Sequence, residues 1–199
     1  MKEYRDHYFL KAKQENYPAR SVYKLKEIDG RFKIFRKGMK AAPGSWSLGA
    51  AERVGAQGKV LACDIQSTVT VFPPNVEFHQ EDVFQRSEAF ERQLAETGPF
   101  HVVMSDMAPQ TTGTKFTDQA RSLELCLEAL AVAEKYLVKG GSFVVKIFMG
   151  PDVGELLKGM RPRFARVTSF KPQSSRVESK ETFFVGLGFK GKEADGARD

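Results

Sequence analysis

Hydrophobic residues along this chain of 199 residues fall into two alternating patterns. Short, nearly continuous apolar runs are typical of buried strands, and apolar residues three or four positions apart are typical of helices with one buried face. The two patterns follow one another through most of the chain. Strands that are apolar on both faces, separated by amphipathic helices, predict a mostly parallel central sheet with helices on both faces, which is an α/β fold.

The same pattern gives approximate bounds for each element. Strands are expected over residues 59–65, 101–106, 142–148, 167–170 and 182–189. Helices are expected over residues 46–54, 118–137 and 152–160, and a further helix is expected within residues 19–32, where Val22, Leu25, Ile28 and Phe32 share a face. The pair Gly140-Gly141 is expected to end the region of the longest helix. The tail, about 190–199, is polar and is expected to fray.

One stretch departs from this alternation. The small-residue turn Ala41-Ala-Pro-Gly-Ser45 runs directly into the helix at 46–54. A turn of this kind usually follows a buried strand, but here it follows Gly38-Met-Lys40. It has neither the glycine spacing of a dinucleotide-binding fingerprint nor the Gly-Lys-Ser/Thr of a P-loop. Its small side chains would let a ligand approach the backbone, and the start of the helix would favour a carboxylate.

Composition limits the class of protein. A length of 199 residues favours a single domain over 1–199, and 41% hydrophobic with 28% charged residues is ordinary for a globular protein. No apolar run reaches the roughly 18 residues that a membrane helix needs. Cys63 and Cys126 lack CxxC spacing and the three histidines are scattered, so neither a disulfide nor a metal site is expected. A cytoplasmic protein without a membrane segment is predicted.

Positive charge is concentrated near the N-terminus. Residues 1–40 contain 12 Lys or Arg against 5 Asp or Glu, whereas the rest of the chain contains 19 against 20. A basic segment of this kind can neutralise nucleic-acid phosphates and release their counterions. Charge alone equally allows a solvated basic face or a membrane-binding patch, so it does not decide the partner.

Four charged residues lie where predicted strands end. In an open α/β sheet, ligands bind outside the carboxyl ends of the strands, and Asp64, Asp82, Asp106 and Lys146 are expected at such ends. Asp64 and Asp82 also suit ordinary turns. Asp106 precedes Met107-Ala-Pro, which would present it from a stiff loop. Lys146 interrupts an apolar run, so it either reaches solvent from the strand end or has a function.

Six motifs, in this order, resemble those of the FtsJ/RrmJ family of ribose 2′-O-methyltransferases over about residues 6–189. They begin at Ala19, Ala41, Ser105, Ala120, Gly141 and Ser175 and read ARSVYKLKEI, AAPGSWS, SDMAPQTTG, ARSLEL, GSFVVK and SRVESKE. Any one motif is weak evidence, but the ordered set is specific. The resemblance implies a Rossmann-like methyltransferase fold with S-adenosylmethionine as the cofactor.

The resemblance also implies roles for individual residues. A catalytic lysine–aspartate–lysine–glutamate set carries over to Lys24, Asp106, Lys146 and Glu181. Cofactor contacts carry over to Gly44, Trp46, Asp64, Asp82 and Asp106, with Asp64 facing the adenosine part, Asp82 near the adenine and Asp106 near the methyl group. In the implied reaction, a ribose 2′-hydroxyl attacks the methyl group, Lys146 receives the hydroxyl proton, and Asp106 and Glu181 position the reacting groups.

The implied substrate is a ribose, expected to be that of a uridine, in large-subunit ribosomal RNA on the assembled subunit. The basic segment of about 1–40 would grip this RNA, and a monomer is expected to suffice. Three alternatives stay open: a tRNA ribose methyltransferase, a non-catalytic RNA-binding protein on the same fold, and a nicotinamide-dependent oxidoreductase. The complete catalytic set argues against the second, and the absent glycine fingerprint argues against the third.

One departure from the family pattern concerns the fold itself. In the family, a short apolar strand that carries an acidic residue and ends in glycine separates Gly-Met-Lys from Ala-Ala-Pro-Gly, whereas here Lys40 adjoins Ala41. The first strand, about the length of a typical one, is therefore expected to be missing. Its loss would open a gap in the core and misplace the loop under the cofactor. Either the sequence as written omits a segment of the polypeptide, or the deletion is real.

Overall fold

A seven-stranded sheet runs through the middle of the structure, a computed structural model that describes residues 7–42, 46–176 and 178–191. The strands lie in the order β3-β2-β1-β4-β5-β7-β6. Their bounds are β1 Lys40–Ala42, β2 Lys59–Asp64, β3 Val76–Gln80, β4 Phe100–Ser105, β5 Leu137–Phe148, β6 Phe164–Phe170 and β7 Glu181–Phe189. Strands β1 to β5 pair in parallel, and β7 is antiparallel to both β5 and β6. The predicted α/β fold with a mostly parallel sheet is confirmed.

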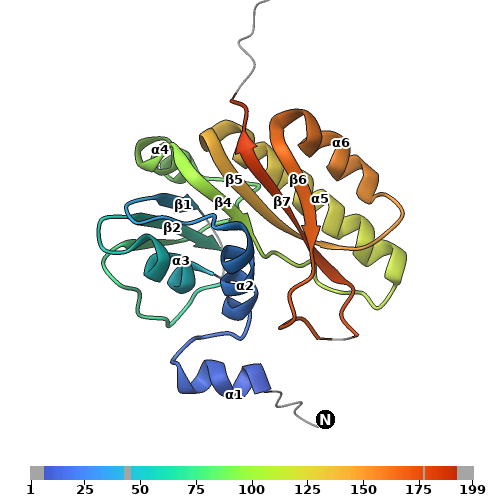
Figure 1. Cartoon of the computed structure of the whole chain (residues 1–199), viewed down its shortest axis with the longest axis horizontal. Helices are drawn as coiled ribbons and strands as arrows, with labels where there is room; N and C mark the ends of the chain where they lie inside the picture. The colour runs from blue at the N-terminus through green and yellow to red at the C-terminus, as the bar shows by residue number, and fades with distance from the viewer. Residues whose placement is uncertain (1–6, 43–45, 177, 192–199) are drawn as a thin grey trace, which may run out of the picture.

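Helices cover both faces of this sheet (Figure 1). Their bounds are α1 His7–Gln14, α2 Val22–Phe32, α3 Ser47–Val54, α4 Glu88–Thr97, α5 Lys115–Tyr136 and α6 Val153–Arg163. On one face, α2 and α3 bury Leu25, Ile28 and Val54 in a core with Val144 of β5. On the other face, α4, α5 and α6 pack against the sheet in a second core, which contains Phe90, Leu94, Leu130, Leu156 and Phe143. The protein therefore has three layers, with a separate core on each side of the sheet.

Helix α1 stands away from these layers and contacts the body of the protein through α2 (Figure 1). A small cluster joins them, formed by Tyr8, Ala12, Tyr17, Val22 and Tyr23. The predicted helix within residues 19–32 corresponds to α2. Among the described residues, no helix is both long and apolar enough to cross a membrane.

The expectation of a missing first strand is corrected by β1. Lys40–Ala42 pairs with β2 through Lys40 opposite Lys59, and with β4 through Ala41 opposite Val102. Ala41 and Ala42 are fully buried, because their small methyl side chains fit between the neighbouring strands and the two flanking cores. Residues expected to form a turn thus belong to an interior strand of the sheet, between β2 and β4. This strand is short, with three residues against six in β2 and six in β4.

Strand β5 also differs from the expectation. It begins at Leu137, directly after α5, and continues through Gly140-Gly141, which were expected to end that region. The partners on β4 shift at this point, from Leu137 opposite Phe100 to Ser142 opposite Val102, so the glycines form a bulge. Gly140 has a φ of 83°, and a Cβ on Gly141 would lie 2.9 Å from the Val138 carbonyl oxygen. Only glycine suits both positions.

Helices α1 and α4 carried too little apolar signal to be assigned from the sequence, and β3 was anticipated only through the strand end expected before Asp82. In α4, which is mostly polar, only Phe90, Leu94 and Thr97 are buried. Both cysteines are buried free thiols, as expected. The tail at 192–199 lies outside the described residues.

Candidate active site

The alternation of side chains along three strands brings charged residues to the face of the sheet that α2 covers. In β5, Val144 belongs to the core with α2, whereas Phe143 and Val145 belong to the opposite core. Successive residues of a strand point to opposite faces, so Lys146, two positions after Val144, lies on the α2 side.

The same rule applies to the two neighbouring strands. In β4, Val102 and Met104 face the α2 side, and Asp106 continues that spacing immediately after the strand. In β7, Phe183 and Val185 face the α2 side, and Glu181 is two positions before Phe183. Three charged residues from separate segments therefore converge beside α2.

The strand register brings them to the same level. Ser105 is opposite Val145 in the parallel pair, so Asp106 lies next to Lys146. In the antiparallel pair, Lys146 is opposite Phe183 and Phe148 is opposite Glu181. Lys146 of β5 and Glu181 of β7 thus lie on adjacent strands, at the edge of the sheet where β4 and β5 end.

Lys146 is held firmly by Asp106. Its Nζ donates a 2.6 Å hydrogen bond to the Asp106 backbone carbonyl, and the same nitrogen lies 3.1 Å from Oδ1 of the Asp106 carboxylate. The side chains of Lys146 and Asp106 are only 10% and 6% exposed. Burial raises the pKa of Asp106, while the positive charges of Lys146 and Lys24 act in the opposite direction.

A second pair joins α2 to β7. Lys24 forms an ion pair with Glu181, whose Oε1 also accepts a 3.0 Å hydrogen bond from the Ser175 hydroxyl. Burial raises the pKa of Glu181, but the hydrogen bond and charge of Lys24 outweigh it and lower the pKa overall. Each lysine also lowers the pKa of the carboxylate in the other pair: the charge of Lys24 acts on Asp106, and the charge of Lys146 acts on Glu181. The structure therefore brings together all four residues of the predicted catalytic set.

A hollow of about 340 Å³ opens beside this set. It is lined by Arg20, Lys24, Arg176, Glu178, Ser179 and Glu181, which carry three positive and two negative charges. The Arg20 guanidinium also holds the Ser174 carbonyl, which ties α2's leading turn to the segment before β7. Sequence reasoning assigned no role to Arg20 or Arg176, although both lie inside motifs that carry the family resemblance.

Of the carboxylates predicted to hold the cofactor, Asp64 lines a cavity, and Asp82 immediately precedes a residue that lines another. Asp64 ends β2, accepts a 2.9 Å hydrogen bond from the Gln66 amide through Oδ1, and borders a cavity of about 210 Å³. Asp82 follows β3 and accepts a 2.8 Å hydrogen bond from the Phe84 amide. The residue after it, Val83, lines an apolar cavity of about 30 Å³.

Apolar side chains and the Asp64 carboxylate surround these two spaces. The apolar cavity is bordered by Val83, Met104 and Met107, and Cys63 borders both cavities. Apolar walls with a few polar groups at fixed places are typical of small-molecule sites. Carboxylate oxygens accept hydrogen bonds from hydroxyl and amino groups, which are the polar groups that a ribose and an adenine present.

Trp46 and Gly44 are the other two residues predicted to contact the cofactor. Trp46 is buried in the core, with its ring centroid 5.4 Å from that of Phe183. Its Nε1 has no hydrogen-bond partner within the part of the chain that the structure describes. A buried donor of this kind calls for an acceptor, and a polar group of a bound ligand would supply one. Gly44 lies outside the described residues.

The mostly parallel sheet with an antiparallel final pair is a fold shared with a solved S-adenosylmethionine-dependent O-methyltransferase from Thermotoga maritima, which has a TM-score of 0.55 at 12% identity and covers 86% of this chain and 66% of its own. Residues 17–189 match the model of the FtsJ-like methyltransferase family. The chain belongs to this family, as the motif resemblance predicted. The prediction of S-adenosylmethionine as cofactor is confirmed with it.

Known proteins similar to this chain carry a consistent name. A protein of Nitratidesulfovibrio vulgaris named ribosomal RNA large subunit methyltransferase E is 74% identical, over 100% of both chains. A protein of Bdellovibrio bacteriovorus with the same name is 51% identical, over 94% of this chain and 97% of its own. Among solved structures, one described as a ribosomal RNA methyltransferase from Plasmodium falciparum has a TM-score of 0.77 at 24% identity, covering 88% of this chain and 100% of its own. This last likeness concerns the fold.

The alignment with the Nitratidesulfovibrio protein also bears on the short first strand. It extends over 204 positions, whereas this chain has 199 residues, so at least five aligned positions have no counterpart here. A deficit of this size is compatible with the short β1, which has three residues and pairs with β2 and β4.

Proposed function

We propose that this protein transfers the methyl group of S-adenosylmethionine to the 2′-hydroxyl of a ribose, that of a uridine, in large-subunit ribosomal RNA on the assembled subunit. The observation that carries the proposal is the buried set of Lys24, Asp106, Lys146 and Glu181 at the carboxyl edge of the sheet. The ribosomal RNA named for the similar proteins supports the choice of substrate.

The residues at the ends of β2, β3 and β4 would hold the cofactor. Asp64 would accept hydrogen bonds from the ribose of the adenosyl group, and Asp82 would accept one from the adenine amino group. When bound, S-adenosylmethionine supplies an electrophilic methyl group on a positively charged sulfur. Asp106 would lie nearest the reacting centre, because it is the carboxylate that also holds Lys146.

Lys146 would receive the proton of the attacking hydroxyl. A neutral amine has two N–H groups and one lone pair, and the two Asp106 acceptors, at 2.6 Å and 3.1 Å, suit the two N–H groups. The lone pair is then oriented for the hydroxyl proton. After the transfer, the Asp106 carboxylate would stabilise the lysine ammonium at once, without rearrangement of water or side chains.

The second pair would act on the oxygen of the same hydroxyl. Lys24 carries a positive charge that would stabilise the negative charge developing on the oxygen as its proton leaves. Glu181, fixed by Ser175, would hold Lys24 in place. The arrangement separates a proton acceptor from an electrostatic stabiliser, and both are prepared before the substrate arrives.

The hollow lined by Arg20 and Arg176 would receive the RNA backbone. Arginine binds phosphate through paired hydrogen bonds, and phosphate contacts fix the register of a nucleic acid without reading its sequence. The 2′-hydroxyl itself distinguishes RNA from DNA. The protein would act as a monomer in the cytoplasm, where such an RNA is found.

The test is methyl transfer from labelled S-adenosylmethionine to three substrates: assembled large subunits, free large-subunit RNA and tRNA. Digestion to nucleosides identifies the product. The expected result is 2′-O-methyluridine from large-subunit RNA, with the highest rate on assembled subunits. Methylation of a base, or a preference for tRNA, would contradict the proposed substrate. A Lys146→Ala variant with full activity would contradict the proposed mechanism.

A further inference from the structure

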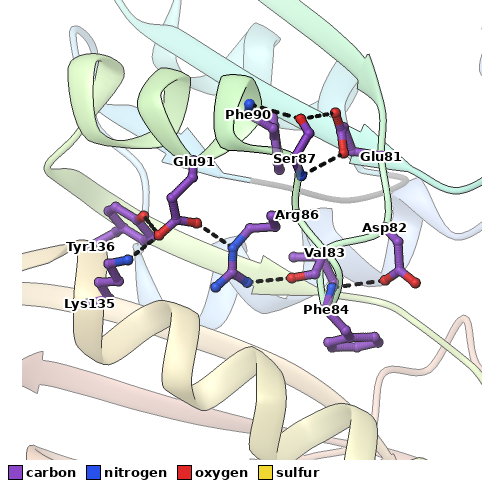
Figure 2. A network of polar contacts seen from close by, with 10 residues as sticks. All are labelled: Glu81, Asp82, Val83, Phe84, Arg86, Ser87, Phe90, Glu91, Lys135 and Tyr136. Atoms are coloured by element: carbon purple, nitrogen blue, oxygen red, sulfur yellow. Dashed lines mark hydrogen bonds and ion pairs between the residues drawn. The ribbon is translucent and has the colours of Figure 1, made fainter.

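The segment between β3 and α4 is braced by side chains that the proposed mechanism does not use. It contains Asp82, which the proposed function assigns to the adenine, and Val83, which lines the apolar cavity, and it ends where α4 begins. Figure 2 shows the polar contacts that surround it, with side chains from this segment, from α4 and from the end of α5 directed toward one another. Within the segment, Val83 belongs to the core on that side of the sheet and Phe84 packs against it, and the polar contacts fix the backbone around these two residues.

Arg86 joins this segment to α4. Its Nε donates a 2.6 Å hydrogen bond to Oε2 of Glu91, and its Nη1 donates to the backbone carbonyl of Val83 (Figure 2). The Arg86 side chain is 22% exposed. A planar guanidinium that uses two donors on two fixed acceptors allows the backbone at Val83 little freedom.

Glu91 is itself fixed from the opposite side by α5. Its Oε1 accepts a 2.6 Å hydrogen bond from the Tyr136 hydroxyl and pairs with Lys135 (Figure 2). Lys135 first, then Tyr136 and Arg86, hold the pKa of Glu91 at about 2, against a usual value of 4.5. The carboxylate therefore remains ionised in any ordinary buffer and links the loop to a long helix of the core.

The two ends of the segment are fixed as well. Ser87 donates a 2.6 Å hydrogen bond to Glu81 and caps α4 by accepting a 3.2 Å hydrogen bond from the Phe90 amide. Within the segment, Asp82 accepts its hydrogen bond from the Phe84 amide through Oδ1 (Figure 2). The direction of the Asp82 carboxylate is therefore set by the backbone path from Asp82 to Arg86.

We propose that Arg86 and Glu91 are positioning residues for the cofactor, which hold the Val83 backbone so that Asp82 and Val83 meet the adenine in one fixed geometry. This inference rests on the proposed role of Asp82. A fully exposed ion pair would do little to fix the position of the loop. The Glu91 carboxylate, however, is only partly exposed and accepts hydrogen bonds from three donors, one in the loop and two in α5. Loss of either residue would loosen the loop without removing a group that touches the reacting atoms.

The test compares two ligands that differ at the adenine amino group, S-adenosylhomocysteine and S-inosylhomocysteine, by calorimetric titration. The full-length protein is compared with its Asp82→Asn, Arg86→Ala and Glu91→Gln variants. We expect Arg86→Ala and Glu91→Gln to weaken S-adenosylhomocysteine binding about tenfold, as expected for a lost charge-assisted hydrogen bond, and to reduce the preference over the inosyl ligand. In methyl transfer, KM for S-adenosylmethionine should rise by a similar factor with kcat little changed.

A matched control lies on the same helix. Arg92 and Glu88 form an exposed pair at 3.8 Å on α4, with side chains that are 67% and 96% exposed. The Arg92→Ala variant removes an arginine of the same helix and should leave both affinities and the ligand preference unchanged. Arg86→Lys, which keeps the charge and one donor direction, should recover part of the loss and also serves if Arg86→Ala folds poorly.

The outcomes separate this inference from the proposed function. If Asp82→Asn loses the ligand preference while Arg86→Ala and Glu91→Gln keep it, the positioning role is wrong and the proposed cofactor site stands. If both ligands weaken equally in these variants, the residues serve stability alone and the inference is overturned. If Asp82→Asn binds both ligands as the original protein does, the proposed adenine site is itself wrong, and the inference falls with it.

Discussion

Lys146 and Asp106 are neighbours across two parallel strands, joined by a 2.6 Å hydrogen bond to a backbone carbonyl and a 3.1 Å contact to a carboxylate oxygen. The two residues are 40 positions apart in the chain. Their proximity follows from the register of β4 and β5 and from the alternation of side chains along each strand. The carboxylate fixes the amine on which the proposed proton transfer depends.

Replacing Lys146 should therefore strongly reduce methyl transfer while the protein still binds S-adenosylmethionine. Lys146→Ala should lower kcat by about 100-fold or more, the usual contribution of a general base, while the affinity for S-adenosylmethionine changes little. Lys146→Arg should be similarly inactive, because an arginine cannot give up its proton to act as a base. Methyl transfer to RNA and calorimetric titration of the cofactor measure the two effects. Lys158→Ala, at an exposed position of α6, is the matched control and should retain activity.

Restoring the strand that the motif spacing lacks should strengthen cofactor binding. Insertion of Val-Leu-Asp-Leu-Gly between Lys40 and Ala41 would lengthen β1 from three residues and return Ala41 and Ala42 to the turn beneath the cofactor. We expect the affinity for S-adenosylmethionine to rise at least about tenfold, equivalent to about one further hydrogen bond. A five-residue Gly-Ser insertion at the same place is the control. Equal affinity with and without the native-like insertion would mean that the short β1 is sufficient.

Asp29 should be important for stability. Its side chain is 1% exposed, accepts a 3.0 Å hydrogen bond from the Phe35 amide and pairs with Arg53 of α3. Asp29→Ala would leave the buried Phe35 amide without its acceptor, whereas the half-exposed Arg53 can be solvated, so the free energy of unfolding should fall by about 1–3 kcal/mol in urea titrations. Asp29→Asn keeps one acceptor and should lose less. Glu88→Ala, on the exposed face of α4, should change the value by no more than about 0.5 kcal/mol.

Glu91 should contribute stability that depends on pH. Its folded pKa, about 2, is below its usual value of 4.5, so its contribution is complete above about pH 4.5 and is lost as the pH falls toward 2. Glu91→Gln should therefore lower the free energy of unfolding at pH 7, by about 1 kcal/mol after allowance for solvent screening. The difference from the original protein should shrink as the pH is lowered to 3. In Glu88→Gln, the corresponding difference should stay near zero at each pH.

RNA binding should weaken with salt, and Arg176 should account for part of that dependence. If Arg176 contacts a phosphate in the hollow beside Glu181, Arg176→Ala should reduce the slope of log affinity against log salt by about one. Filter binding of large-subunit RNA at salt concentrations from about 50 mM to about 200 mM measures this slope. Arg166→Ala, at an exposed position of β6, should leave the slope unchanged. An identical slope for both variants would remove Arg176 from the interface.

The sequence by itself determined those elements whose residues bury apolar side chains at regular spacing. The runs at 59–65 and 101–106 became β2 and β4, and the spacing of Val22, Leu25 and Ile28 became the buried face of α2, because burial of such side chains stabilises the element locally. The motifs also identified Lys24, Asp106, Lys146 and Glu181 as one set, which the structure then brought together.

Only the tertiary structure decided features that depend on what lies across the sheet. Ala41 and Ala42 became strand rather than turn because β2 and β4 offered backbone partners on both sides. Gly140-Gly141 became a bulge because β4 required a shift in register there. The contact of Glu91 with Lys135 joins residues 44 positions apart, and no local sequence pattern predicts it. Hydrogen bonds between distant segments depend on three-dimensional proximity, which neither apolar spacing nor residue type records.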